Sequence, residues 1–178
     1  MSEWTQAQLD ALIVCPKRIT VPPKTRMEQA RGYWRNGMDL EAVDGSRRFR
    51  AYMRVNDAFP ENFSIGLIVL PVDGAAGDLR EEIHLLRCNG PHEEVGSKEA
   101  KPGMPGWHFG YHIHRAKADN MDAGMRAERG AETTSEYGSF SEALSFFVKT
   151  CGVQGAKAYL SEILAKRLFD QTEVDEGG

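Results

Sequence analysis

Apolar and polar residues along the chain follow three successive patterns. The first residues carry apolar side chains at helical intervals, behind a capping-box pair formed by Thr5 and Gln8. A long middle stretch alternates with a period of two, which is typical of half-buried strands. Helical spacing then returns, with a second capping box from Ser139 to Glu142. The predicted sections are an N-terminal helix over 1–16, a sheet-rich core over 17–118, C-terminal helices over 119–171 and a frayed acidic tail over 172–178.

Two strands and two turns stand out in the alternating stretch. Arg48 to Val55 places apolar residues on one face and arginines with a tyrosine on the other, whereas Phe63 to Val72 is almost entirely apolar and predicts a central buried strand. Asn36-Gly37 and Asp44-Gly45 both have the composition of two-residue hairpin turns. Strands in one block with helices at both ends predict an α+β domain.

We expect an antiparallel sheet of about five to six strands, packed by the N-terminal helix and by two C-terminal helices, the second over 155–169. At 178 residues the chain predicts a single domain, 1–178. No stretch approaches 18 uncharged apolar residues and no secretory signal is visible, so we expect a cytoplasmic protein without membrane contact. Its three cysteines lie far apart and predict neither a disulfide framework nor a thiolate zinc site.

Charge is distributed unevenly along the chain. The formal net charge of −4 argues against a generally basic nucleic-acid binder. Residues 17–54, however, hold ten basic against four acidic residues, and residues 119–178 hold six basic against eleven acidic ones. The charges of these two segments either neutralise each other on the folded surface, or the basic segment faces an anionic ligand. The candidate RNA-binding or partner-binding residues on the basic strand are Arg48, Arg50 and Arg54.

All five histidines fall within 31 residues, from His84 to His114. Alternation in one continuous strand over 107–115 predicts that His108, His112 and His114 share a face, with the aromatic residues between them packed inward. This clustering is the strongest sign of chemistry in the sequence.

A second group of polar residues ends the preceding strand. Arg87 and Asn89 have the same parity as the core residues Ile83 and Leu85, so a buried Arg87 would need an anionic partner. The following Gly-Pro turn is a rigid platform that aims His92. We therefore add Arg87, Asn89 and His92 to the candidate site.

Four interpretations of this constellation stay open. Two of His92, His112 and His114 could act as general acid and base in metal-free RNA cleavage, with arginines stabilising the phosphorane and no cofactor. His112 and His114 could instead bind a divalent metal, since the spacing of Gly106, His112, His114 and Asp119 partly resembles the first cupin motif. The same residues could form a recognition surface without turnover, or be structural.

The strand block from residue 47 to 116 resembles TumE-like toxins of bacterial toxin–antitoxin systems, most specifically in Leu86-Arg87-Cys88-Asn89-Gly90-Pro91-His92 and in His112-Ile113-His114. Those toxins are grouped with the barnase, EndoU, colicin and RelE ribonucleases. The resemblance implies an RNA-cleaving toxin with an antitoxin protein as partner, with Arg87, His92, His112 and His114 as site residues. The alternative prediction is a non-enzymatic, mobile-element-encoded protein that binds and blocks a host nucleic-acid-guided defence complex.

Within the acid/base hypothesis, we expect His92 and His112 to be the pair that exchanges protons. His114 would orient them or substitute for one of them. Arg87, with Arg50 or Arg54, would hold the phosphate.

Overall fold

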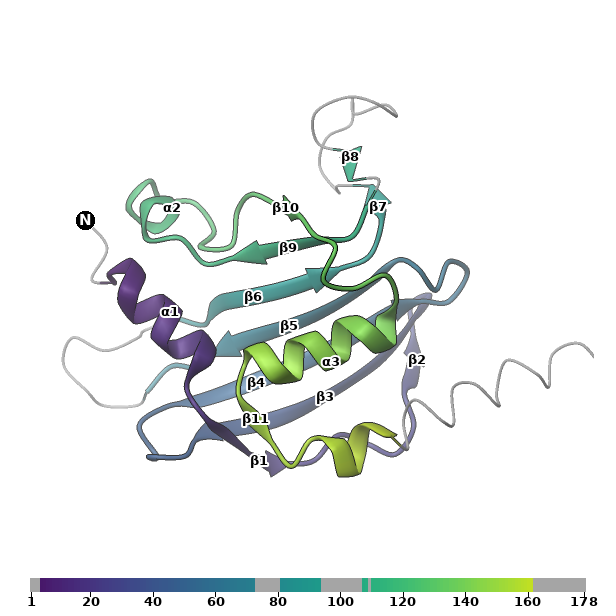
Figure 1. The fold of residues 1–178 in the computed structure, drawn as a ribbon, viewed down its shortest axis with the longest axis horizontal. Helices are drawn as coiled ribbons and strands as arrows, with labels where there is room; N and C mark the ends of the chain where they lie inside the picture. The colour runs from purple at the N-terminus through teal and green to yellow at the C-terminus, as the bar shows by residue number, and fades with distance from the viewer. Residues whose placement is uncertain (1–3, 73–80, 94–106, 109, 162–178) are drawn as a thin grey trace, which may run out of the picture.

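Most strands of the chain form one open sheet, and two helices cover one side of it (Figure 1). The computed structural model describes residues 4–72, 81–93, 107–108 and 110–161. In chain order the elements are α1 (Gln6–Val14), β1 (Lys17–Val21), β2 (Glu28–Ala30), β3 (Tyr33–Ala42), β4 (Arg48–Asn56), β5 (Phe63–Val69), β6 (Ile83–Asn89), β7 (His92–Glu93), β8 (Trp107–His108), β9 (His112–Arg115), α2 (Ala118–Asp122), β10 (Glu132–Thr133), α3 (Phe140–Thr150) and β11 (Val153–Gln154).

The sheet confirms the predicted α+β class but has more strands than the predicted five to six. Nine strands of the described residues belong to it, in the order β10-β9-β6-β5-β4-β3-β1-β11, with β2 also paired to β3. All pairs are antiparallel except β1 with β11. The extra strands β2, β10 and β11 contain only two or three residues, which is too few for an alternating pattern to reveal them.

The predicted N-cap residues begin the two helices that cover the sheet, with a complete capping box at α1, whereas at α3 the Glu142 side chain accepts from the Gly138 N–H and not from that of Ser139. Thr5 accepts a hydrogen bond from the backbone of Gln8, whose side chain returns to the Thr5 backbone. Ser139 likewise accepts from the backbone of Glu142. A further helix begins at residue 157, and its predicted continuation to 169, like the predicted tail, lies outside the described residues. No helix in the described part of the chain has the length and apolar character of a membrane span.

One of the two predicted hairpin turns is wrong. Asn36 and Gly37 lie inside β3, opposite Met53 and Tyr52 of β4. The turn before β3 is instead made by Arg31 and Gly32, both with positive φ, as a two-residue hairpin requires. The turn at Asp44-Gly45 is present, and Gly45 has a φ of 75°.

The core lies between the sheet and helices α1 and α3. Apolar residues of β3, β4 and β5 pack there with Leu9 and Ile13 of α1 and with Phe147 of α3. Lys17 is fully buried at the end of both helices, where its Nζ donates to the carbonyl oxygens of Ile13, Cys15 and Cys151 at 2.8 to 3.0 Å. We call the opposite side of the sheet, which faces away from α1 and α3, the open face.

Candidate active site on the open face of the sheet

Strand register brings the candidate residues together on the open face. Residues directly opposite one another in neighbouring strands point to the same side of a sheet. The register therefore builds two adjacent rows across β4, β5, β6 and β9, which are Arg54, Ser64, Asn89, His112 and Tyr52, Gly66, Arg87, His114.

A bulge in β6 overturns the parity that the sequence predicts for Arg87 and Asn89. The register with β5 shifts between Leu67 and Ile68, so that Leu85 is an extra residue in β6. Beyond it, Leu86 and Cys88 face the core, and Arg87 faces the open side with Asn89. Arg87 is half-buried, not sealed in the core as its parity with Ile83 predicts.

Three imidazole rings lie side by side at the end of these rows. The ring centroids of His92 and His112 are 4.8 Å apart, and those of His112 and His114 are 5.1 Å apart. We call these three residues the imidazole row. The structure thus brings together the three histidines that we expected to act together. They differ in their exposure to solvent, because His92 is half-buried, whereas His112 and His114 expose only 1% and 5% of their surface.

His108 does not share β9 with His112 and His114, contrary to the predicted continuous strand. β8 and β9 are separate strands, and His108 pairs with His92 in a second, two-stranded sheet. His84 lies on the open face, with its ring 6.2 Å from that of Tyr52. Among the described residues, no three His, Cys, Asp or Glu side chains form a group that could hold a metal ion.

Backbone carbonyls set the tautomer of each ring in the imidazole row. Nδ1 of His92 lies 2.9 Å from the Gly90 oxygen, Nδ1 of His112 lies 2.9 Å from the Gly110 oxygen, and Nδ1 of His114 lies 3.2 Å from the Glu128 oxygen. A carbonyl oxygen only accepts hydrogen bonds, so each Nδ1 carries a hydrogen. In the neutral ring the basic lone pair is then on Nε2.

The Nε2 atom of His112 is engaged by a neighbouring side chain. The Asn89 amide nitrogen lies 3.3 Å from it, and the Ser64 hydroxyl donates to the Asn89 side-chain oxygen at 2.9 Å. This orients the amide so that Asn89 donates to His112. The chain from Ser64 to His112 holds that ring in one tautomer, which suits a positioning role.

Tyr137 fixes the backbone beneath His112 from the core side. Its hydroxyl donates to the His112 carbonyl oxygen at 2.7 Å and accepts from the Asn89 backbone N–H at 3.1 Å. Burial raises the pKa of this hydroxyl far above its ordinary value of 10.0. Tyr137 was not among the predicted site residues, because it lies 25 residues beyond His112 in a stretch without periodicity.

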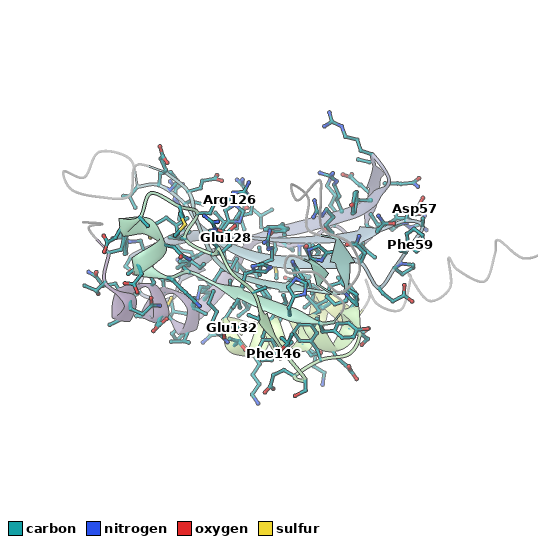
Figure 2. All side chains as sticks on the ribbon, turned by 90° about the horizontal axis from the view of Figure 1, so that it is seen from above. Asp57, Phe59, Arg126, Glu128, Glu132 and Phe146 are labelled. Atoms are coloured by element: carbon teal, nitrogen blue, oxygen red, sulfur yellow. The ribbon has the colours of Figure 1, made fainter. Side chains whose placement is uncertain are left out.

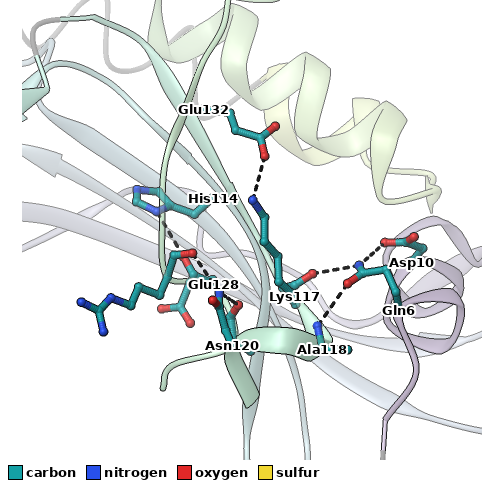
Figure 3. A network of polar contacts seen from close by, with 11 residues as sticks. Gln6, Asp10, His114, Lys117, Ala118, Asn120, Glu128 and Glu132 are labelled. Carbon is teal, nitrogen blue, oxygen red and sulfur yellow. Dashed lines mark hydrogen bonds and ion pairs between the residues drawn. The ribbon is translucent and has the colours of Figure 1, made fainter. Parts of the chain in front are cut away.

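The loop that supplies the acceptor for His114 is held by its own polar network, shown in Figure 3. The Asn120 amide nitrogen donates to the carbonyl oxygens of Ala127 and Arg129, each at 2.9 Å, and so brackets Glu128. Gln6 of α1 ties the start of the same segment by accepting from the Ala118 N–H at 3.1 Å. Figure 2 shows Arg126 and Glu128 on the opposite side of the sheet from Phe146.

Arg87 lies directly opposite His114 in the register of β6 with β9. Its Nε is buried and has no hydrogen-bond partner among the described residues. Tyr52 lies in the same row, and burial raises the pKa of its hydroxyl while the guanidinium groups of Arg87 and Arg54 act in the opposite direction. A guanidinium with an unused donor beside histidines suits an oxyanion.

The three arginines predicted to form a basic row on β4 have different surroundings. Arg50 forms ion pairs with Asp39 at 3.5 Å and with Glu82 at 3.8 Å. Arg48 is exposed, and it lies opposite Glu41 of β3. Arg54 is half-buried with its guanidinium carbon 4.7 Å from the centre of the Tyr33 ring. Of the three, Arg54 lies in the same row as Asn89 and His112.

No protein-family model matches this chain, and neither the curated proteins nor the solved structures give a significant match. The resemblance to TumE-like toxins therefore stays a prediction from the sequence, and function is argued from the site.

Proposed function

We propose that this chain is a metal-independent endoribonuclease of the toxin type that cleaves RNA through the imidazole row. The observation that supports this most is that three imidazole rings lie side by side next to Arg87, whose buried Nε has no hydrogen-bond partner among the described residues. Histidine serves as both acid and base near neutral pH, and a nearby cation stabilises the phosphorane.

The hydrogen bonds favour a different division of roles from the predicted pair of His92 and His112. His112 Nε2 is bonded to Asn89, so His112 positions its neighbours, and His92 and His114 exchange the protons. One of these two takes the proton from a ribose 2′-hydroxyl, whose oxygen attacks phosphorus. The other gives its Nε2 proton to the departing 5′-oxygen, which leaves a 2′,3′-cyclic phosphate.

Cleavage of single-stranded RNA in the presence of EDTA tests this proposal. We expect a 2′,3′-cyclic phosphate product, a bell-shaped dependence of kcat/KM on pH, and losses of about 10² to 10⁴ for His92→Ala and His114→Ala. Lys149→Ala on α3, on the other side of the sheet, serves as the control and should leave the rate unchanged. Equal rates for the parent, His92→Ala and His114→Ala, or loss of the parent's activity in EDTA, would contradict the proposal.

The toxin character has its own test in cells. Expression of the chain should slow growth, and His92→Ala should relieve this effect if cleavage causes it. In cells that express the parent chain, co-expression of an antitoxin protein as its partner should restore growth. Equal toxicity of His92→Ala and the parent would count against catalysis as the cause.

The low exposure of His112 and His114 favours a second candidate, a docking protein without turnover. In that case the imidazole row stiffens the end of β6 and β9, and the arginines of the open face contact a host complex such as a nucleic-acid-guided defence complex. A stable complex recovered with one host assembly, together with RNA that stays intact beside the pure protein, would support this candidate against the nuclease.

A further inference from the structure

We propose that the loop between β4 and β5 and the adjacent Tyr33–Arg54 pair bind single-stranded RNA, with Phe59 stacking on a base. This inference rests on the proposed function, because it gives the imidazole row a substrate class. It is carried by the placement, around the same end of the sheet, of an exposed aromatic ring and of arginines that form no ion pair with another described residue.

Phe59 is presented to solvent by a loop that is held at both ends. Its side chain is 69% exposed, the largest value among the exposed large apolar residues of the described chain. The Asn56 side-chain oxygen accepts from the backbone N–H groups of Ala58 and Phe59 at 3.0 and 2.9 Å, and the Asn62 N–H donates back to the Phe59 carbonyl. A ring on a fixed loop loses little conformational entropy when it stacks on a base.

The loop touches the segment that carries His92. The Gly90 N–H donates to the Phe63 carbonyl oxygen at 3.1 Å, and a Cβ on Gly90 would lie 1.7 Å from the Glu61 carbonyl oxygen. Glu61 is two residues from Phe59, and Gly90 is two residues from His92. A base stacked on Phe59 would therefore belong to a nucleotide close to the imidazole row. Figure 2 shows Phe59 with Asp57 at one end of the sheet.

On its other side the loop adjoins a cluster of cations. The Asp57 N–H donates to the Gly32 carbonyl oxygen at 3.0 Å, next to Tyr33. The Tyr33 ring lies 4.7 Å from the Arg54 guanidinium carbon and 5.9 Å from that of Arg35. Neither arginine takes part in an ion pair with another described residue, in contrast to Arg50.

These cations suit a phosphate backbone that runs across the open face. Stacking on Tyr33 orients the Arg54 guanidinium and leaves its N–H groups for a phosphate. From Arg54 to His112 the row crosses three strand spacings, which is about 14 Å. A single strand fits this arrangement better than a duplex, because only unpaired bases can turn toward Phe59.

Fluorescence anisotropy with 2′-O-methyl RNA of about ten nucleotides tests binding apart from cleavage, since this RNA lacks the attacking hydroxyl. We expect Phe59→Ala to weaken binding about tenfold and Phe59→Trp to retain it. Val43→Ala, another exposed apolar residue, should bind like the parent. Arg54→Gln should lower the slope of log Kd against log salt by about 0.7, whereas Lys149→Gln on α3 should not. A duplex of the same sequence should bind more weakly.

Binding that is unchanged in both Phe59→Ala and Arg54→Gln, or no binding of the single strand at all, would overturn this inference. If 2′-O-methyl RNA binds through these residues but unmodified RNA is never cut, the inference stands and the nuclease proposal fails. If unmodified RNA is cut and Phe59→Ala leaves KM unchanged, the nuclease proposal stands and this inference fails. Capture of a host protein that Phe59→Ala abolishes, without RNA binding, would assign the surface to a protein instead.

Discussion

The Tyr52 ring lies directly over Gly66, where a Cβ would come within 2.3 Å of the ring atoms Cε1 and Cζ. The missing side chain on β5 lets the tyrosine of β4 reach across the strand toward Arg87 of β6, the third member of the row. This packing occupies the centre of the open face and places an aromatic hydroxyl beside the cation of the candidate site.

Gly66→Ala should therefore impair the site more than the fold. The added methyl group meets the far end of a side chain that can rotate away, so we expect a loss of about 1 kcal/mol in the free energy of unfolding, at the low end of the cost of overpacking. Displacement of Tyr52 from Arg87 should lower kcat/KM for RNA cleavage about tenfold or more. Urea denaturation and the cleavage assay measure the two effects.

A double-mutant cycle with Tyr52→Ala provides the control. Without the ring, the alanine at position 66 meets no obstacle, so Gly66→Ala should add no further loss of activity in the Tyr52→Ala background. Additive losses would show that Gly66 acts through something other than Tyr52.

Gly90→Ala should damage the fold itself. Its Cβ would lie 1.7 Å from a backbone oxygen, that of Glu61, and neither backbone segment can rotate away as a side chain does. We expect a loss of about 3 kcal/mol in the free energy of unfolding, and weaker binding of 2′-O-methyl RNA because the loop and His92 separate. Gly110→Ala is the matched control, because a Cβ there has no neighbour within 4 Å. Equal urea midpoints for the two variants would contradict this explanation.

Periodicity predicted the helix-sheet-helix order and the face of β4, but it could not locate the bulge in β6. A bulge adds one residue without changing composition, and every side chain after it changes face. This is why the sequence placed Arg87 toward the core, whereas the structure places it with His114 on the open face. The convergence of Arg87, Asn89 and the histidines was predictable only because several strand ends carried polar residues.

Tyr137 and Lys17 could not be recognised as structural residues from the sequence. Both act through backbone carbonyls of segments that are distant in the chain. Every residue has such a carbonyl, so the sequence does not show which of them will accept a hydrogen bond. Tyr137 joins the ends of β6 and β9, and Lys17 joins the ends of α1 and α3. Their roles follow from the three-dimensional arrangement of main-chain acceptors.

Lys17→Met should destabilise the protein strongly. The methionine fills a similar volume but donates no hydrogen bond, and the carbonyl oxygens of Ile13 and Cys151 then stay buried without that donor. We expect a loss of about 3 kcal/mol in the free energy of unfolding, measured in urea. Arg18→Met, at an exposed neighbour that pairs with Glu41, should change it by about 0.5 kcal/mol or less. A similar small change for both variants would show that the bonds of Lys17 contribute little.

Two buried thiols should make the fold sensitive to alkaline pH. Burial raises the pKa of Cys88 and of Cys151 from 9.0 to about 12. Between these values the unfolded chain releases thiol protons that the folded chain retains. The free energy of unfolding therefore falls as pH rises, by at most about 1.4 kcal/mol per pH unit for each thiol. Lys17 acts in the opposite direction below pH 10.5, because burial lowers its pKa and the unfolded chain binds the extra proton.

The contribution of the thiols can be separated by comparing slopes. Urea denaturation of the parent and of the Cys88→Ala/Cys151→Ala variant, followed from about pH 8.5 to about pH 11, should show a clearly steeper alkaline loss in the parent. The variant starts from a lower stability, because two buried sulfurs are removed, so the slope and not the absolute value is the relevant quantity. Parallel slopes would mean that the thiols ionise equally in both states, and hence that they are more accessible to solvent than their burial indicates.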